Sequence, residues 1–160
     1  MAQGGDFDLQ DFLPYLLNQA AEATSRGFQA TYRARYGMTR TQWRVMANLG
    51  RFGAMTARDI CRLSHIEKTK VSRAVAGLAG AGLLTRTTSP DDRRAENLSL
   101  TPRGHAVFVE IGRHAQDFDA SLRDRLGPEI AGRIDAILRE IIALNAEVED
   151  DQSAPSPSLK

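Results

Sequence analysis

The sequence has few of the features that identify secreted, membrane-spanning or disulfide-bonded proteins. Its 160 residues include one cysteine, Cys61, which excludes an intrachain disulfide and fits a reducing compartment. No apolar run approaches the ~18 residues that a membrane span needs. The N-terminus lacks a basic region followed by an apolar one, so we expect no signal peptide. These absences predict a cytoplasmic protein with no membrane partner.

Patterns for metal binding and catalysis are also missing. The three histidines, His65, His105 and His114, do not have the i, i+4 spacing of a metal site, and Cys61 does not cluster with them. The sequence has no nucleophile elbow and no glycine loop of the kind that cradles phosphate. The acidic pair at positions 91–92 falls in a predicted solvated turn, which offers no desolvation to tune a general acid. We therefore expect no metal, no cofactor and no enzymatic activity.

The net charge is small, but it is unevenly distributed. Lys+Arg 21 against Asp+Glu 20 gives +1. Residues 56–104 hold nine Lys/Arg and five Asp/Glu, a net of +4, whereas residues 105–160 hold six against eleven, a net of −5. A basic centre beside an acidic C-terminal third indicates an anionic partner for the centre.

Apolar periodicity and capping residues predict a mainly α-helical chain. We expect Asp11 to cap the first helix, Thr56 the third, and Thr101, followed by Pro102, the long helix after the strands. The outer helices carry more apolar face than a small central domain can cover, which predicts a partner subunit. The predicted helices cover about 12–36, 39 or 41 to 52, 56–63, 68–81, 102–126 and 129–148, with strands at 83–88 and 95–100. The inward side of the last helix is predicted to consist of Ile130, Ile134, Ile137, Leu138, Ile141 and Leu144.

Residues 57–75 have the pattern of a helix-turn-helix. Ile60 is apolar, Cys61 is small where two helices would cross, and Ile66 lies in the turn. The crossing position favours a packed, inert thiol for Cys61 over an oxidant sensor. His65 occupies a turn position where glycine is common. The outward face of the second helix carries the donors that a major groove requires, although a merely solvated basic face is the alternative. These donors are Lys68, Thr69, Lys70, Ser72 and Arg73.

The segment SPDDRRAENLSLT, residues 89–101, predicts the tip and second strand of a hairpin directly after that helix. Folding does not require two arginines at a solvated tip. A narrow minor groove attracts arginine, so Arg93 and Arg94 are predicted to form the tip of a wing, with Asp92 bracing Arg94. An ordinary charged surface turn is the alternative.

These segments resemble the MarR family of winged helix-turn-helix regulators. The resemblance covers roughly residues 7–148 and is carried by SPDDRRAENLSLTPRG at 89–104, EKTKVSRAVAGLAGAGLL at 67–84 and TRTQWRVMANL at 39–49. It implies a homodimer whose recognition helices meet successive major grooves of a pseudo-palindromic DNA operator. It also implies a small-molecule effector, often aromatic or anionic, that releases the DNA. Most members of the family are repressors.

The residue patterns and the family resemblance together predict how the chain is organised. It comprises a flexible tail at 1–8, a helical dimerisation region at 9–38 and 101–149, a winged helix-turn-helix with a two-stranded wing at 39–100, and a disordered tail at 150–160. A winged-helix protein-interaction module and a ligand-independent DNA-binding protein remain the alternatives. The candidate effector pocket, whose members are equally compatible with plain core packing, consists of Tyr15, Tyr32, Arg33, Tyr36, Trp43 and Met46.

Overall fold

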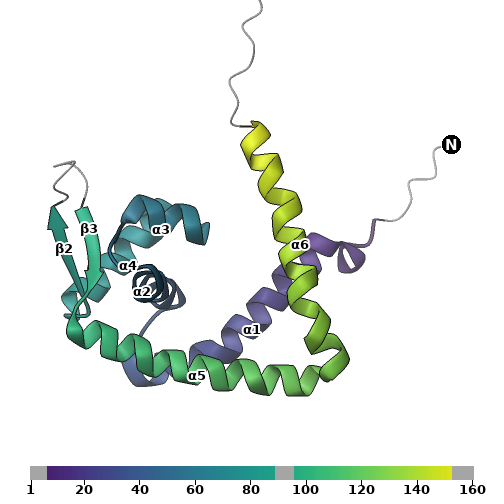
Figure 1. Ribbon diagram of the computed structural model, residues 1–160, viewed down its shortest axis with the longest axis horizontal. Coiled ribbons are helices and arrows are strands. Elements are labelled where there is room, and N and C mark those ends of the chain that lie inside the picture. Colours follow the sequence, from purple (N-terminus) through teal and green to yellow (C-terminus); the bar gives the residue numbers. More distant parts are fainter. Residues whose placement is uncertain (1–6, 89–95, 153–160) are drawn as a thin grey trace, which may run out of the picture. The chain divides into compact units, whose positions relative to one another are not determined.

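The computed structural model describes residues 7–88 and 96–152, the last seven of these by their backbone alone (Figure 1). A short 3-10 turn, η1, precedes the first helix. The predicted order of helices and strands is confirmed, and one further strand is present. The elements are η1 (Leu9–Asp11), α1 (Leu13–Tyr36), α2 (Arg40–Phe52), β1 (Met55–Thr56), α3 (Ala57–Ser64), α4 (Lys68–Gly80), β2 (Leu84–Thr88), β3 (Glu96–Leu100), α5 (Pro102–Leu126) and α6 (Pro128–Gln152).

The start of α1 differs from the prediction. Asp11 does not cap this helix, because it lies inside η1, which Asp8 begins by accepting a hydrogen bond from the Gln10 amide at 2.8 Å. Phe12 is the N-cap of α1, and its side chain makes no capping hydrogen bond. The helix ends as predicted at Gly37, whose φ of 61° is a left-handed conformation that glycine adopts without strain.

Capping boxes fix the starts of α2 and α3. Thr39, rather than Thr41, caps α2. Its Oγ1 accepts a hydrogen bond from the backbone N–H of Gln42, and the side-chain Oε1 of Gln42 accepts one from the backbone N–H of Thr39 at 2.8 Å. Thr56 and Asp59 form the same reciprocal pair at α3, which confirms Thr56 as its cap. Two orphan amides are thereby satisfied at each helix start.

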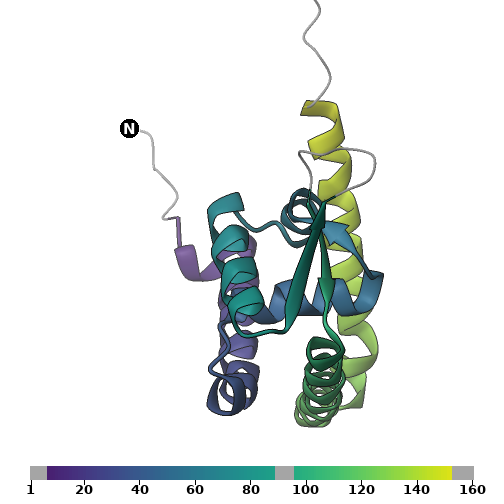
Figure 2. The same ribbon diagram turned by 90° about the vertical axis from the view of Figure 1, so that its left-hand side faces the viewer.

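The sheet has three antiparallel strands in the order β1-β3-β2, so the predicted two-stranded hairpin is incomplete (Figure 2). The additional strand, β1, pairs Met55 with Leu98 on β3. Two residues are too few to show an alternating pattern, which is why the sequence does not reveal this strand. The predicted inward position of Leu98 is confirmed, since it is 1% exposed.

One hydrophobic core joins the helix-turn-helix to the sheet. Ile60, Val71 and Val45 are fully buried in it, and Cys61 and Ile66 pack against its edge at half-buried positions. His65 closes α3 in a left-handed conformation with φ 49° and ψ 45°, the only such non-glycine among the described residues. The predicted helix-turn-helix, with a glycine-like turn at His65, is confirmed.

The chain divides into two compact units, residues 1–115 and 116–160, with α5 continuing from the first into the second. In the second unit, Arg123 ties α5 to α6, with its guanidinium 2.7 Å from Asp119 and 3.0 Å from Asp135. Gly127, at φ 82°, makes the turn between these helices. None of the helices in the described ranges is long and apolar enough to cross a lipid bilayer.

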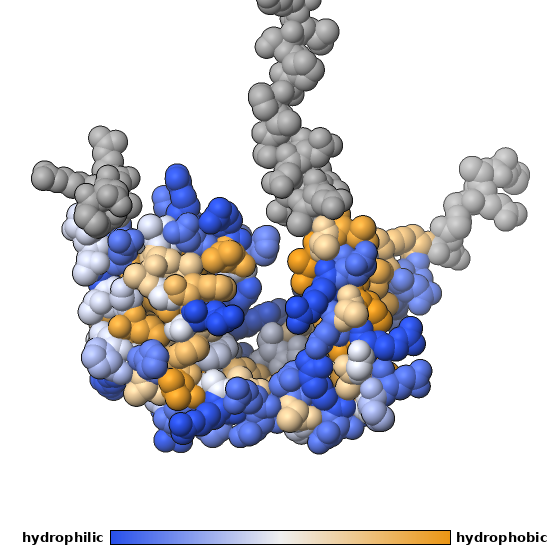
Figure 3. Space-filling view, in the orientation of Figure 1, coloured by the Kyte–Doolittle hydropathy of each residue, from blue (hydrophilic) through white to orange (hydrophobic). Residues whose placement is uncertain are grey.

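The predicted inward face of α6 is not buried within this chain. Ile134 and Ile141 are only half-buried, and hydrophobic side chains are visible on the surface over α6 (Figure 3). The helix forms as its amphipathic pattern predicts, but the described residues supply no core on which this face packs. The exposed members of the predicted set are Ile130, Ile137, Leu138 and Leu144.

Candidate nucleic-acid interface

The second helix of the helix-turn-helix, α4, has one buried and one open side. Val71, Ala74, Val75 and Leu78 anchor it in the core. The other side carries all five predicted donors in exposed positions: Lys68, Thr69, Lys70, Ser72 and Arg73. These donors therefore share one accessible surface.

The donors on α4 flank two different hollows. Lys68 and Ser72 line a hollow of about 720 Å³ between α4, the start of α3 and the base of the wing, here called the wing-side hollow. Lys70 and Arg73 line a second hollow of about 250 Å³, the α2-side hollow, together with Thr41 at the start of α2. Thr69 lies between these two flanks in sequence. The structure brings the five residues together along a surface with a cation on each flank.

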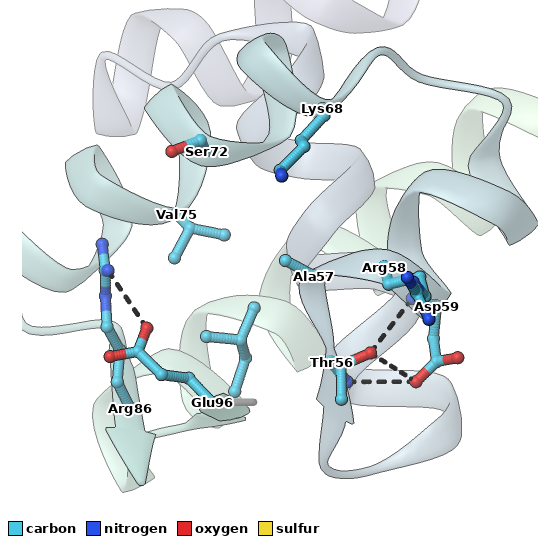
Figure 4. A pocket seen from close by; sticks show the side chains of 10 residues that line it. Thr56, Ala57, Arg58, Asp59, Lys68, Ser72, Val75, Arg86 and Glu96 are labelled. Carbon is cyan, nitrogen blue, oxygen red and sulfur yellow. Dashed lines mark hydrogen bonds and ion pairs between the residues drawn. The ribbon is translucent and has the colours of Figure 1, made fainter. Parts of the chain in front are cut away.

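Charged side chains line the wing-side hollow (Figure 4). Lys68 extends into the space from α4, and Arg86 Nη1 lies 3.4 Å from Glu96 Oε2 at its edge. Asp59 accepts hydrogen bonds from the Thr56 amide at 3.2 Å and the Thr56 hydroxyl at 2.7 Å. These hydrogen bonds, followed by the nearby Arg62 and Arg58 charges, hold the pKa of the Asp59 carboxyl below its ordinary value, against the opposing effect of desolvation.

The α2-side hollow contains residues that the sequence does not single out. Thr39, Thr41 and Gln42 reach it from α2, about thirty residues away from Lys70 in the chain. A Cβ on Gly77 would collide with the side-chain amide nitrogen of Gln42, so α2 and α4 are close at this point. The absence of a side chain at Gly77 leaves room for the α2 capping box. No local pattern joins these distant segments, and only the packing of α2 on α4 does so.

The predicted tip of the wing, Asp92, Arg93 and Arg94, lies outside the described residues. The root of the wing is described and is firmly attached to α5. Thr101 Oγ1 donates to the Gly82 carbonyl at 2.8 Å and accepts from the Gly104 amide at 2.9 Å. The Thr101 amide donates to the Leu83 carbonyl at 3.1 Å.

A third hollow, the aromatic hollow, lies between α1 and α2 and has a volume of about 340 Å³. Tyr32 and Trp43 from the predicted effector pocket line it, and their rings stack with centroids 6.0 Å apart. Phe28 meets Trp43 edge-on at 5.9 Å. The sequence prediction lacks four lining residues, Ser25, Phe28, Arg40 and Arg44. Ser25, Phe28 and Tyr32 follow one another at i, i+3 and i, i+4 steps on α1. On α2, Arg40 lies three residues before Trp43 and four before Arg44, and this spacing is a signal that could have found them.

The other members of the predicted effector pocket lie elsewhere. Met46 is fully buried in the core, and Tyr15 and Arg33 do not line the aromatic hollow. Tyr36 donates from its hydroxyl to Glu110 Oε2 on α5 at 2.5 Å, and Arg35 lies 2.7 Å from the other carboxylate oxygen. The hydrogen bond from the Tyr36 hydroxyl to Glu110 raises the pKa of Tyr36. Tyr36 therefore links α1 to α5.

Two arginines give the aromatic hollow a cationic rim. Arg40 pairs with Glu22 at 2.5 Å, whereas Arg44 donates to the Ser64 carbonyl at 2.6 Å and meets no carboxylate in the described ranges. Burial, followed by the nearby Arg40 charge, lowers the pKa of the Arg44 guanidinium. Burial also raises the pKa of Tyr32, and the Arg40 charge partly opposes that rise. An anion beside Arg44 would offset this unpaired charge.

Comparison with known proteins shows which family the chain resembles. The sequence profile of the MarR family matches residues 36–95, from the last residue of α1 to the residue before β3. The MarR family transcriptional regulator of Silicibacter pomeroyi is 29% identical, with a TM-score of 0.76 over 87% of this chain and 98% of that one. The chain is similar to MarR family transcriptional regulators in the sequence of residues 36–95 and in its fold. Its winged helix is similar to that of the Silicibacter pomeroyi regulator.

Two further relatives match most of the chain. The transcriptional regulator FarR of Neisseria gonorrhoeae is 27% identical over 134 residues, which cover 84% of this chain and 88% of FarR. BpsR of Bordetella bronchiseptica is 26% identical with a TM-score of 0.74, covering 86% of this chain and 97% of BpsR. The DNA binding of BpsR is regulated by 6-hydroxynicotinic acid.

Proposed function

We propose that this protein is a homodimeric, sequence-specific DNA-binding repressor, and that a small aromatic or acidic ligand releases it from a pseudo-palindromic operator. The observation that carries the proposal is the open face of α4, where five donors lie between two hollows with cationic linings. A helix of this kind fits the major groove, where long donors bind base edges and short hydroxyls bind phosphates. Arg73 is the residue expected to bind a guanine edge in bidentate fashion.

Exposed apolar side chains support the homodimer. They are concentrated on the first turns of α1, where Leu13 is 56% exposed, and along α6, where Ile142 is 68% exposed. A second copy of the chain would bury these faces. Two-fold symmetry would place two copies of α4 in successive major grooves, about 34 Å apart. Repression is the usual activity of the family, and it follows physically when the operator overlaps a promoter.

The aromatic hollow supports the ligand. Half-buried Trp43, stacked on the buried ring of Tyr32, offers an apolar wall, and Arg40 and Arg44 provide positive charge beside it. This combination suits an aromatic carboxylate. The relative BpsR responds to a molecule of that class, 6-hydroxynicotinic acid.

The DNA experiment is a footprint on the sequence immediately upstream of the protein's own gene, followed by titrations of the protected fragment. We expect Arg73→Ala to cost about 1–3 kcal/mol and to relax the preference at particular base pairs. Arg94→Ala should weaken binding to all sequences alike. Arg26→Ala, on α1, is the control and should bind as wild type does.

If the Arg73 and Arg94 variants both bound the footprinted operator as tightly as wild type does, the assignment of these residues to DNA contact would be wrong. A wild-type chain that binds no DNA at low salt would instead favour a winged-helix protein-interaction module. Tight binding without sequence preference, and without relief by any ligand, would favour a ligand-independent DNA-binding protein.

The ligand experiment uses Trp43, the single tryptophan of the chain, as a fluorescent reporter inside the hollow. A panel of aromatic acids and their thioesters is titrated, and active compounds are then tested for release of the operator. Arg44→Gln should weaken binding of the carboxylates, because it removes the rim charge that no carboxylate in the described ranges offsets. Arg33→Gln, which alters an arginine outside the lining, should leave the affinity unchanged. Equal losses in the two variants would move the ligand site away from this hollow.

A further inference from the structure

The wing-side hollow contains charge that the fold does not neutralise. Its lining has three cations, Arg58, Lys68 and Arg86, against two acids, Asp59 and Glu96. Asp59 is held by the α3 capping box, and Arg86 pairs with Glu96. Asp59 also pairs with Arg62, which is not part of the lining. Lys68 and Arg58 are therefore the lining cations that form no ion pair with any residue that the structure describes, and Lys68 is the one that extends into the space (Figure 4).

The Arg86–Glu96 pair is loose and accessible. Arg86 lies opposite Leu98 in the β2–β3 register, which puts Glu96 at the diagonal position on the same face of the sheet. The two side chains are 40% and 56% exposed, and the 3.4 Å separation is longer than that of a strong charge-assisted hydrogen bond. Exposed pairs of this kind contribute little to stability, and their members can bind another ion instead.

The lining favours a phosphate over an apolar ligand. Ala57, Val75 and Leu98 are its apolar members, and it contains no aromatic ring on which a base or an aromatic ligand would stack. Besides the Arg58 guanidinium at the start of α3, its donors include the ammonium of Lys68, the hydroxyl of Ser72 and the guanidinium of Arg86. These come from α4 and from the root of the wing, the two elements that approach the duplex in the function proposed above.

We propose that the wing-side hollow receives one backbone phosphate of the bound DNA, and that Arg86 leaves Glu96 to bind it together with Lys68 and Ser72. The inference rests on the proposed DNA-binding function. Glu96 is then an internal competitor for Arg86. It lowers the affinity for every duplex without altering the preference for sequence, because phosphates carry no sequence information.

The test measures the affinity of the full chain by fluorescence anisotropy, over a series of KCl concentrations. The probes are the footprinted operator and an unrelated duplex of equal length. Lys68→Gln and Arg86→Gln should each weaken binding to both duplexes by the same factor, and each should reduce the slope of log affinity against log salt by about 1. Glu96→Gln should tighten both complexes. Arg26→Gln is the control for removal of a distant cation, and thermal melting verifies that each variant folds.

The Arg86→Gln/Glu96→Gln double variant separates exchange from simple repulsion between Glu96 and DNA. Exchange predicts that Glu96→Gln gains little once Arg86 is gone, so that the double variant binds like Arg86→Gln alone. Additive effects would overturn the exchange, as would a Glu96→Gln variant no tighter than wild type. Specific operator binding that survives unchanged in Lys68→Gln and Arg86→Gln would overturn this inference while leaving the proposed function intact. A wild-type chain that binds no duplex would overturn both.

Discussion

Asp59 stabilises the first turn of α3 through a carboxylate whose pKa lies below its ordinary value. The folded protein therefore holds this proton less tightly than the unfolded chain does. The resulting stability is present above the unfolded pKa, near 3.9 for aspartate, and is lost as pH falls through the lower folded pKa. We predict that Asp59→Asn lowers the free energy of unfolding at pH 7 by roughly 1 kcal/mol, as for the loss of a helix cap.

Urea unfolding at a series of pH values measures this effect. The difference in the free energy of unfolding between wild type and Asp59→Asn should become smaller as pH falls below about 4, where the carboxylate begins to take up its proton. Asp124→Asn, on α5, is the matched control. A difference that stayed constant down to about pH 2 would mean that the carboxylate charge is not the source of the stabilisation.

Gly104 and Gly112 provide a matched pair within α5. A Cβ on Gly104 would collide with the Leu83 carbonyl oxygen, whereas one on Gly112 meets nothing within 4 Å. We predict that Gly104→Ala lowers the free energy of unfolding by about 1–3 kcal/mol through overpacking. Gly112→Ala should raise it by up to about 1 kcal/mol, because alanine is the better helix former. Thermal unfolding of both variants tests the pair, and equal shifts of the two midpoints would contradict the close contact of Gly104 with Leu83.

Single residues can be predicted from the sequence where a local bond determines their role. Thr56 and Thr101 are recognisable as caps because their partners lie three residues away. Asp11 resembles a cap but is not one, because the 3-10 turn begun by Asp8 competes for the same segment. Arg40 and Arg44 lie beside Trp43 on α2, but this spacing gains meaning only from Phe28 and Tyr32 on α1, and a single sequence does not reveal that the two helices meet there.

The link between α1 and α5 is a feature of whole elements. Tyr36, at the end of α1, and Glu110, within α5, are joined by one hydrogen bond across 74 positions of the chain. We predict that Tyr36→Phe and Glu110→Gln each lower the free energy of unfolding by about 0.5–1.5 kcal/mol. The double variant should lose less than the sum, because both changes remove the same bond. Urea titration of the four proteins gives the coupling energy, and strict additivity would show that the bond contributes nothing.

At the element scale, long periodic segments can be predicted and short pairings cannot. The helices beginning at Arg40 and Pro102 are predicted within one or two residues because caps and apolar periodicity agree there. The strand at Met55–Thr56 exists only through its pairing with Leu98 and Asn97. Thr41 and Arg73 line one hollow only because α2 packs on α4, and neither segment has a signature of this.

The exposed face of α6 makes a prediction for the whole molecule. Ile142→Glu places a charge where the proposed homodimer buries apolar surface, so we expect dissociation to monomers at micromolar concentration. Phe52→Glu alters an apolar residue of similar exposure, 61%, at the end of α2, and should leave the dimer intact. Sedimentation velocity separates these outcomes. A monomeric wild type, or a dimeric Ile142→Glu variant, would remove α6 from the interface.

The sequence anticipates this open face only in part. It shows that the outer helices hold more apolar surface than one chain needs, and it places Ile137 and Leu144 on one stripe. It does not show that the stripe remains open in the folded chain, because periodicity identifies an apolar face and says nothing about what covers that face.

The attachment of the wing to α5 has a mechanical consequence. Thr101 is hydrogen-bonded to Gly82 and Leu83, and Gly104 packs directly against the Leu83 carbonyl. The residues before β2 and the first turn of α5 are therefore held in fixed contact. The wing and the N-terminal part of α5 therefore form one rigid lever. Any rotation of the N-terminal part of α5 about its own axis turns β2 and β3 through the same angle, and the resulting displacement of these strands grows with distance from their root.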